Sequence, residues 1–437
     1  MHFSPFNSVL VRRWVLLLSV GIGCSSSWSQ AEHHQAAASV DSKVASVPAQ
    51  SASKPAVRKP RPQLAVGTAF APDGSLWLVG LNAESQLFVQ SALPPKEGGS
   101  HQWSAPRIID TGGDAISADG ENHPKLAFGP KGWVVISYSK PLATRFTALV
   151  RMLRSTDGGS TFSAPVTLHT DLQEIAHSFD SIVFDAKGAL HAVWLDKRDG
   201  ERAPKLGDKS TYRGSAVYRK VSLDGGATFG ADLRVADHSC ECCRIAVAQG
   251  TDGRAYAMWR HVFEPNVRDH AFAALDAGGA GAPTDAQPMR ATFDNWRVDG
   301  CPHHGPGLSA TAQGGFHTVW FGIRKQGDAD VAGVRYARLN ANGSPVLDSA
   351  RALPDARAEH ADVLAVGERV AVVWRSTDGA RSSAKAWLSS DGGRNFREQL
   401  LGEVNGPNDY PRLLQHAGKF VVVWRNEKEV KVHGIPF

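Results

Sequence analysis

Short apolar runs that follow turn residues recur along the chain from about residue 64 to the C-terminus. Most of these runs end in an aromatic residue, and each is long enough for one β-strand. The seven runs are 74–80, 132–138, 188–194, 253–259, 314–320, 368–374 and 419–424. They recur in units of about 50 to 65 residues with room for several short strands each, so the pattern predicts a β-propeller.

A second repeat runs in step with the first. The motif Ser-x-Asp-Gly-Gly-x-x-Phe occurs at 155–162, 222–229 and 389–396, with degenerate copies at 98–103, 275–279 and 339–343. The aspartate can accept hydrogen bonds from turn amides, and the glycines permit positive φ. We therefore expect Asp157, Asp224 and Asp391 to cap equivalent hairpins.

These motifs resemble the Asp-box, or BNR repeat, of the sialidase superfamily of propellers. The stretches CECC (240–243) and CPHHGP (301–306) resemble a bacterial sialidase-like subgroup. The resemblance implies an all-β, sialidase-like propeller over residues 64–437. Counting the repeats gives seven blades, and six is the alternative because sialidases have six. The Asp-box itself is structural and does not define an activity.

Composition agrees with a β-rich chain. The 437 residues include 43 glycines and 24 prolines, and 42% are hydrophobic, which is enough for a large core. The formal net charge is +5, and the charges are mixed along the chain rather than clustered, so nucleic acid is not expected as the partner.

The N-terminus predicts export. Arg12 and Arg13 precede a short apolar run, so residues 1–30 are interpreted as a signal peptide, and the protein as periplasmic or secreted. Cys24 stands where a lipoprotein would carry its lipid and membrane attachment, and cleavage near Ala31 is the alternative. Residues 31–62 are rich in Ala, Ser and Pro and predict a disordered linker.

Histidines and cysteines gather just ahead of the innermost strand of successive units. In a propeller these positions meet at the axis, so they predict a central funnel. The residues are His123, His177, Cys240, Cys242, Cys243, Cys301, His303, His304 and His360, and His261 follows the end of a neighbouring strand.

The cysteines admit three interpretations. Four remain if Cys24 is removed, and in an oxidising compartment they could form two disulfides, with three possible pairings. A metal site with His303 and His304 is the second interpretation, and thiolates beside imidazoles suit copper or zinc. Free thiols or redox chemistry are the third. A disulfide from Cys301 to one of the other three would link two neighbouring blades.

Basic residues at the ends of the second strands predict an anion-binding funnel. Arginine pairs bidentately with carboxylates. The candidates are Arg198, Arg260, Arg375 and Arg425.

The sialidase resemblance adds catalytic candidates, with Tyr410 as the nucleophile and Asp196 as the acid/base. The Arg-Ile-Pro motif expected before the first full Asp-box is absent, and HPKLAF offers Lys125 instead.

Three functions therefore stand side by side. The first is a sialidase-type glycoside hydrolase acting on anionic sugars. The second is a binding protein whose Cys, His and Arg funnel takes a small-molecule or glycan ligand and a metal ion. The third is a non-catalytic recognition propeller with disulfide-locked blades. The sequence does not fix the oligomeric state.

Overall fold

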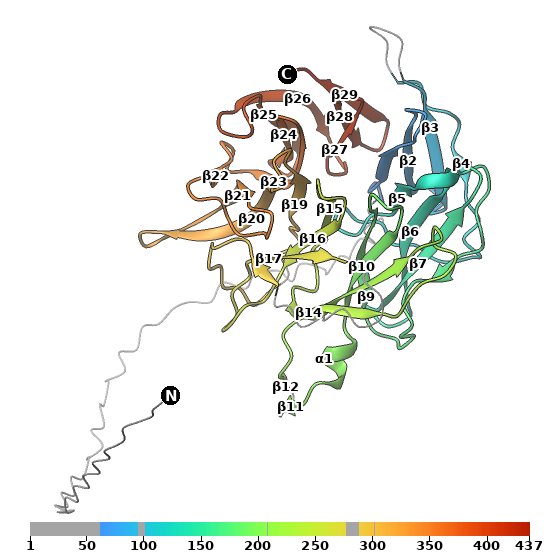
Figure 1. Ribbon diagram of the computed structural model, residues 1–437, viewed down its shortest axis with the longest axis horizontal. Helices are drawn as coiled ribbons and strands as arrows, with labels where there is room; N and C mark the ends of the chain where they lie inside the picture. The colour runs from blue at the N-terminus through green and yellow to red at the C-terminus, as the bar shows by residue number, and fades with distance from the viewer. Residues whose placement is uncertain (1–61, 95–100, 208, 277–287, 301) are drawn as a thin grey trace, which may run out of the picture. The chain divides into compact units, whose positions relative to one another are not determined.

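The computed structural model describes residues 62–94, 101–207, 209–276, 288–300 and 302–437 (Figure 1). Residues Pro60–Phe437 belong to one compact unit. The predicted signal peptide, Cys24 and nearly all of the predicted linker lie outside the described residues, as does Cys301. Among the helices of the described part, none has the length and apolar character needed to cross a membrane.

Seven antiparallel sheets, the blades, follow one another along the chain. Blade 1 contains β1 (Gly67–Phe70), β2 (Leu76–Leu81), β3 (Leu87–Ala92) and β4 (Arg107–Ile108). Blade 2 contains β5 (Lys125–Phe128), β6 (Val134–Pro141), β7 (Ala148–Ser155) and β8 (Val166–Thr167), with the 3-10 turn η1 (Pro130–Gly132) between β5 and β6. Blade 3 contains β9 (His177–Phe184), β10 (Leu190–Asp196), β13 (Ser215–Ser222) and β14 (Leu233–Ser239).

The remaining blades repeat this order. Blade 4 contains β15 (Ala246–Gln249), β16 (Ala255–Arg260), β17 (His270–Leu275) and β18 (Met289–Arg290). Blade 5 contains β19 (Gly307–Ala310), β20 (Phe316–Gln326), β21 (Ala329–Leu339) and β22 (Arg351–Ala352). Blade 6 contains β23 (Ala358–Val366), β24 (Arg369–Thr377), β25 (Arg381–Ser389) and β26 (Arg397–Asn405). Blade 7 contains β27 (Arg412–His416), β28 (Lys419–Arg425) and β29 (Val430–Ile435).

The first strands of the blades form a closed ring. The contacts run from β1 to β5, β9, β15, β19, β23 and β27, and from β27 back to β1. The all-β propeller prediction is thus confirmed, with the seven blades expected from the repeats rather than the alternative six. An insertion between β10 and β13 holds α1 (Arg198–Arg202), β11 (Lys205–Leu206) and β12 (Lys209–Ser210).

The core lies between the blades, where the second strands are almost wholly buried. Trp194, Trp259, Trp374 and Trp424 stand near the ends of β10, β16, β24 and β28 and are at most 1% exposed. These are four of the six aromatic residues that end the apolar runs of the sequence pattern, and the other two, Tyr138 and Trp320, are also buried. Their burial explains why the pattern repeats once per blade, since each blade needs a large side chain against its neighbour.

The three Asp-Gly-Gly turns occupy the same place in three blades. Each joins the third strand to the fourth, in blades 2, 3 and 6. In blade 3 the Asp224 carboxylate accepts hydrogen bonds from the Ser222 hydroxyl at 2.7 Å and the Thr228 amide at 2.9 Å. Gly226 has φ of 84°, a conformation that favours glycine. The expected equivalence of the three turns is confirmed.

Ring closure joins the beginning of the described chain to its end. The Val66 amide donates to Asp409 Oδ2 at 3.0 Å, and Arg425 Nη2 donates to the Leu81 carbonyl at 2.8 Å. Figure 1 shows the blue strands of blade 1 beside the red strands of blade 7. Since no strand is shared between these two blades within the described residues, contacts of this kind hold the ring shut.

Candidate functional site

A cavity of about 240 Å³ lies on the ring axis, lined by residues from all seven blades. Each blade contributes residues of its first strand or of the segment just ahead of it, and blade 3 does so from the middle of β9, with Ser181 and Ile182. The polar side chains among the lining residues are Thr68, His123, Lys125, Ser181, Arg244, His360, Asp362 and Arg412. His123 and His360, two of the predicted funnel residues, therefore face this cavity.

Glu121 is the centre of the polar network at the cavity. Its carboxylate accepts from the Arg244 amide at 3.0 Å, Arg244 Nη1 at 2.6 Å, the Gly305 amide at 2.8 Å and His360 Nδ1 at 2.9 Å. The side chain is 1% exposed. Burial alone would raise the pKa of Glu121, but the charge of Arg244 and the hydrogen bond from His360 outweigh it and hold the pKa well below its usual range.

Arg244 extends this network to the neighbouring blades. Its Nε donates to the Pro306 carbonyl at 3.2 Å, and its Nη2 donates to the Ala361 carbonyl at 2.7 Å. A Cβ on Gly305 would lie 2.8 Å from the Arg244 backbone nitrogen and 2.6 Å from its carbonyl oxygen, so only glycine fits there. With Glu121 from the segment before β5, Arg244 thus joins blades 2, 4, 5 and 6.

Tyr410 stands in a stack of rings beside Glu121. The His360 and Tyr410 rings are 3.5 Å apart and nearly parallel, and His304 stacks on the other side of His360 at 4.5 Å. The Arg375 guanidinium lies 4.6 Å from the Tyr410 ring centroid. Burial raises the pKa of Tyr410, and the negative charge of Glu121 adds to that rise. The hydroxyl therefore stays protonated at neutral pH.

Lys125 is the cation of the cavity that forms no ion pair among the described residues, although the charge of the buried Asp180 acts on it. The side chain is buried, its Nζ donates to the His123 carbonyl, and no carboxylate within the described ranges forms an ion pair with it. Burial lowers the pKa of Lys125. Arg412, by contrast, donates to the Gly120 carbonyl at 3.0 Å and to Asp409 Oδ1 at 3.3 Å.

The four arginines predicted to bind an anion are not brought together. Arg260 donates to the carbonyls of Arg268, His304 and Phe321, and Arg425 donates to that of Leu81. Arg375 pairs with Glu359 at 2.6 Å. Arg198 pairs with Asp196 at 2.7 Å and with Asp232 at 3.0 Å. The arginines that line the cavity are instead Arg244, just ahead of the first strand β15, and Arg412, the first residue of the first strand β27.

Asp196, the predicted acid/base, is fully buried in blade 3 and does not line the cavity. It accepts from His177 Nδ1 at 3.0 Å and Trp194 Nε1 at 2.7 Å, besides its pairing with Arg198. Burial would raise the pKa of Asp196, but the hydrogen bonds from His177 and Arg198 outweigh it and lower the pKa. An ionised carboxylate with these partners is unsuited to donating a proton.

The other predicted funnel histidines are spread over several places. His177 stacks on His169 at 3.8 Å within blade 3, and His261 packs against Phe263 at 4.5 Å in blade 4. His303 is exposed and has a positive φ of 52°. Of the pair His303 and His304, only His304 joins the ring stack next to the cavity.

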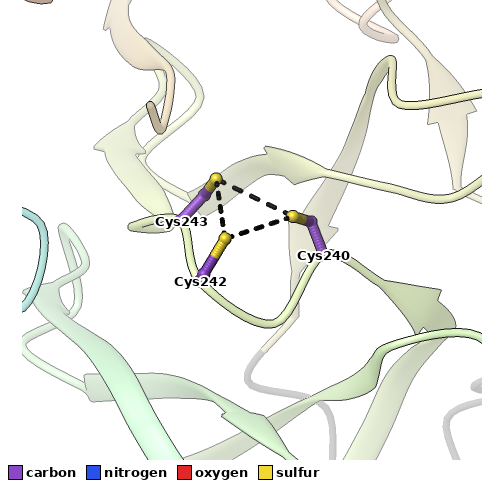
Figure 2. A group of neighbouring side chains, drawn as sticks. All are labelled: Cys240, Cys242 and Cys243. Atoms are coloured by element: carbon purple, nitrogen blue, oxygen red, sulfur yellow. Dashed lines mark hydrogen bonds between the residues drawn. The ribbon is translucent and has the colours of Figure 1, made fainter. Parts of the chain in front are cut away.

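Cys240, Cys242 and Cys243 are free thiols that meet at one point (Figure 2). Their Sγ atoms are 3.7 Å apart for Cys240 and Cys242, 3.8 Å for Cys240 and Cys243, and 4.0 Å for Cys242 and Cys243. All three are at most 4% exposed. Hydrogen bonds from the Cys242 and Cys243 thiols lower the pKa of Cys240. The three are thus not disulfide-bonded to one another, and the predicted bond to Cys301 lies outside the described residues.

No protein-family model matches the chain, and no curated protein matches it. Among solved structures, it is similar to a PL25 ulvan lyase bound to -[GlcA(1-4)Rha3S]-, with a TM-score of 0.51, 13% identity and coverage of 85% of this chain and 94% of that chain. For the polysaccharide lyase Uly1, the TM-score is 0.50 and the sequence identity 9%, with coverage of 85% of this chain and 90% of that chain. For the Hadza microbial sialidase Hz136, the TM-score is 0.42 and the sequence identity 12%, with coverage of 81% of this chain and 71% of that chain. The two lyase matches show that this chain has a propeller fold.

Proposed function

We propose that this protein binds an acidic sugar and holds the sugar's carboxylate in the axial cavity through Lys125. The observation that carries the proposal is the buried Lys125 ammonium, which has no ion-pair partner within the described ranges and lines a cavity between Arg244 and Arg412. A buried charge is costly unless it is paired. A ligand carboxylate would supply the missing partner.

The charge balance at the cavity supports an anion. Arg244 and Arg412 already have protein carboxylates, Glu121 and Asp409. Asp362 also lines the cavity, and burial raises its pKa just as burial lowers that of Lys125, so burial weakens both charges, and no ion pair forms between the two. Asp180, Asp119 and Glu121 act on Lys125 through their charges, Asp180 most strongly, but none of them forms an ion pair with it within the described ranges. Lys125 can therefore still take a direct contact from a ligand anion.

The size of the cavity and the fold support a sugar unit as the carrier of that anion. A volume of about 240 Å³ is below the range of about 300 to 1,000 Å³ that is typical for drug-sized ligands, and it suits one ring. A protein with this fold has been solved with an oligosaccharide that contains GlcA. The predicted export would place the cavity where polysaccharides occur outside the cytoplasm.

The contacts favour binding over sialidase-type hydrolysis. A tyrosine nucleophile needs a neighbouring carboxylate that can take its proton, and Glu121 already accepts four hydrogen bonds. The raised pKa of Tyr410 also makes its hydroxyl harder to deprotonate, which disfavours a nucleophilic role. Asp196 lies away from the cavity lining and is held ionised. Hydrolysis of a sialoside would contradict this assignment.

Calorimetric titration tests the proposal. Glucuronate and N-acetylneuraminate are the acidic probes, and glucose is the neutral control. We expect the acidic sugars to bind and glucose not to bind. Lys125→Met should weaken binding by about 30-fold or more, because one partner of a buried charge pair is removed. Lys187→Met, at an exposed turn of blade 3, is the matched control and should bind as wild type does.

Two results would overturn the proposal. One is equal affinity for glucose and glucuronate, which would mean that the carboxylate is not recognised. The other is unchanged binding in Lys125→Met, provided that its circular dichroism spectrum matches that of wild type. Release of sugar from a sialoside in the same samples would replace binding with hydrolysis as the function.

A further inference from the structure

The turn between blades 3 and 4 presents three sulfur atoms to one another in a buried place. Cys240 follows β14 directly, and its amide donates to the Arg260 carbonyl at 2.9 Å, which fixes the start of the turn against β16. Figure 2 shows the three side chains converging from a single turn. Phe179 packs against them. The thiols are therefore positioned by the fold and sheltered from solvent.

The spacing of the sulfurs fits one metal ion bound equally by all three. The Sγ atoms form a nearly equilateral triangle with sides of 3.7, 3.8 and 4.0 Å. An ion at the centre of such a triangle would lie about 2.1 to 2.3 Å from each sulfur, close to the usual length of a metal–thiolate bond of about 2.3 Å. A disulfide requires about 2.05 Å, so none of the three pairs is bonded.

We propose that Cys240, Cys242 and Cys243 bind one monovalent copper ion in a three-sulfur site. Soft thiolate ligands select Cu(I), and three of them around one ion satisfy it. Structural zinc takes four ligands, and within the described part of the chain no histidine nitrogen or carboxylate oxygen joins the three sulfurs. The ring of His304, in CPHHGP, is instead stacked on Phe321 and His360.

A buried positive charge next to the turn supports an anionic metal centre. Three thiolates around Cu(I) carry two net negative charges. Arg260 is 1% exposed, its Nε has no hydrogen-bond partner, and no carboxylate of the described ranges pairs with it. The hydrogen bond from the Cys240 amide to the Arg260 carbonyl places the two residues side by side. The guanidinium would offset part of the charge of the copper–thiolate group.

Copper loading of the full chain tests the site. The protein is reduced, freed of reductant without oxygen, and titrated with Cu(I) against a Cu(I)-chelating dye, with Zn(II) in parallel. We expect one Cu(I) per chain, retained in the presence of equal zinc. X-ray absorption of the wild-type complex should show three sulfur neighbours and no nitrogen neighbour, a result that does not depend on any variant folding.

Single serine variants locate the site. Cys240→Ser, Cys242→Ser and Cys243→Ser should each lose the stoichiometric copper, with unchanged circular dichroism as the folding control. Cys301→Ser is the matched control and should keep it. The proposal is overturned if wild type takes zinc and no copper, if nitrogen ligands appear, or if Cys301→Ser loses the ion. Failure of thiol-labelling reagents to modify unfolded, unreduced, metal-free protein would also overturn it, since the cysteines would then be disulfides.

Discussion

Replacing Glu121 by glutamine should destabilise the propeller by about 3 kcal/mol, because Arg244 would keep a buried charge without its carboxylate. Breaking a buried ion pair costs about 3 to 5 kcal/mol. Arg244 would retain its bonds to the carbonyls of Pro306 and Ala361, so the lower end of that range applies. The new amide would also direct an NH₂ group toward donors that now meet a carboxylate oxygen.

Urea unfolding measures this loss. Tryptophan emission is a suitable probe because Trp194, Trp259, Trp374 and Trp424 are buried in different blades, and far-UV circular dichroism provides a second. Glu201→Gln, on the exposed side of α1, is the matched control and should change the free energy of unfolding by less than about 0.5 kcal/mol. A loss below about 1 kcal/mol in Glu121→Gln would refute the assigned role of the ion pair.

The difference in unfolding free energy between wild type and Glu121→Gln should depend on pH with a definite sign. The folded pKa of Glu121 lies well below the value of about 4.3 in an unfolded chain. A depressed carboxylate pKa stabilises the protein fully above the unfolded pKa and loses that effect as the pH falls through the folded pKa. The gap between wild type and Glu121→Gln should therefore be constant from neutral pH down to about 5 and shrink only in stronger acid. A gap that closes between pH 7 and 5 would contradict the lowered pKa.

Two further substitutions test the turns and the ring stack. Asp224→Ala should lower the free energy of unfolding in urea by about 1 to 3 kcal/mol, because the Ser222 hydroxyl and the Thr228 amide lose their acceptor. Asp328→Ala, at the exposed turn between β20 and β21, is the control and should change it very little. Equal losses in the two variants would show that the hydrogen bonds of the Asp224 turn do not stabilise the protein. Tyr410→Phe should leave the calorimetric affinity for glucuronate unchanged, since the ring stack on His360 needs no hydroxyl, and a tenfold weaker affinity would show that the hydroxyl contacts the sugar.

The regular part of the fold could be predicted because each blade repeats the same physical requirement. An apolar second strand, an aromatic end and a tight turn recur at similar spacing, so the blade count and the place of the Asp-Gly-Gly turns followed from the sequence. The sequence also led us to expect His123 and His360 near the ring axis, and both line the axial cavity.

The partners inside the site could not be predicted. Glu121 and Arg244 are 123 residues apart, and their pairing depends on how many blades separate them around the ring. Arg260, at the end of β16, looked suited to bind an anion, yet it turns to the carbonyls of the next blade, whereas Arg244, ahead of β15, reaches across to blade 6. His303 and His360 have positive φ, so the directions of their side chains depend on loop conformations that strand periodicity does not encode.

A propeller whose axis is open would let ions and water pass from one face to the other. Here the Glu121–Arg244 ion pair connects blades 2, 4, 5 and 6 across that axis, with the Glu121 side chain 1% and the Arg244 side chain 11% exposed. Permeation would require this pair to separate without new partners, at a cost of several kcal/mol for each passage. We therefore expect the ring to act as a receptacle with a closed end and to conduct neither ions nor solutes.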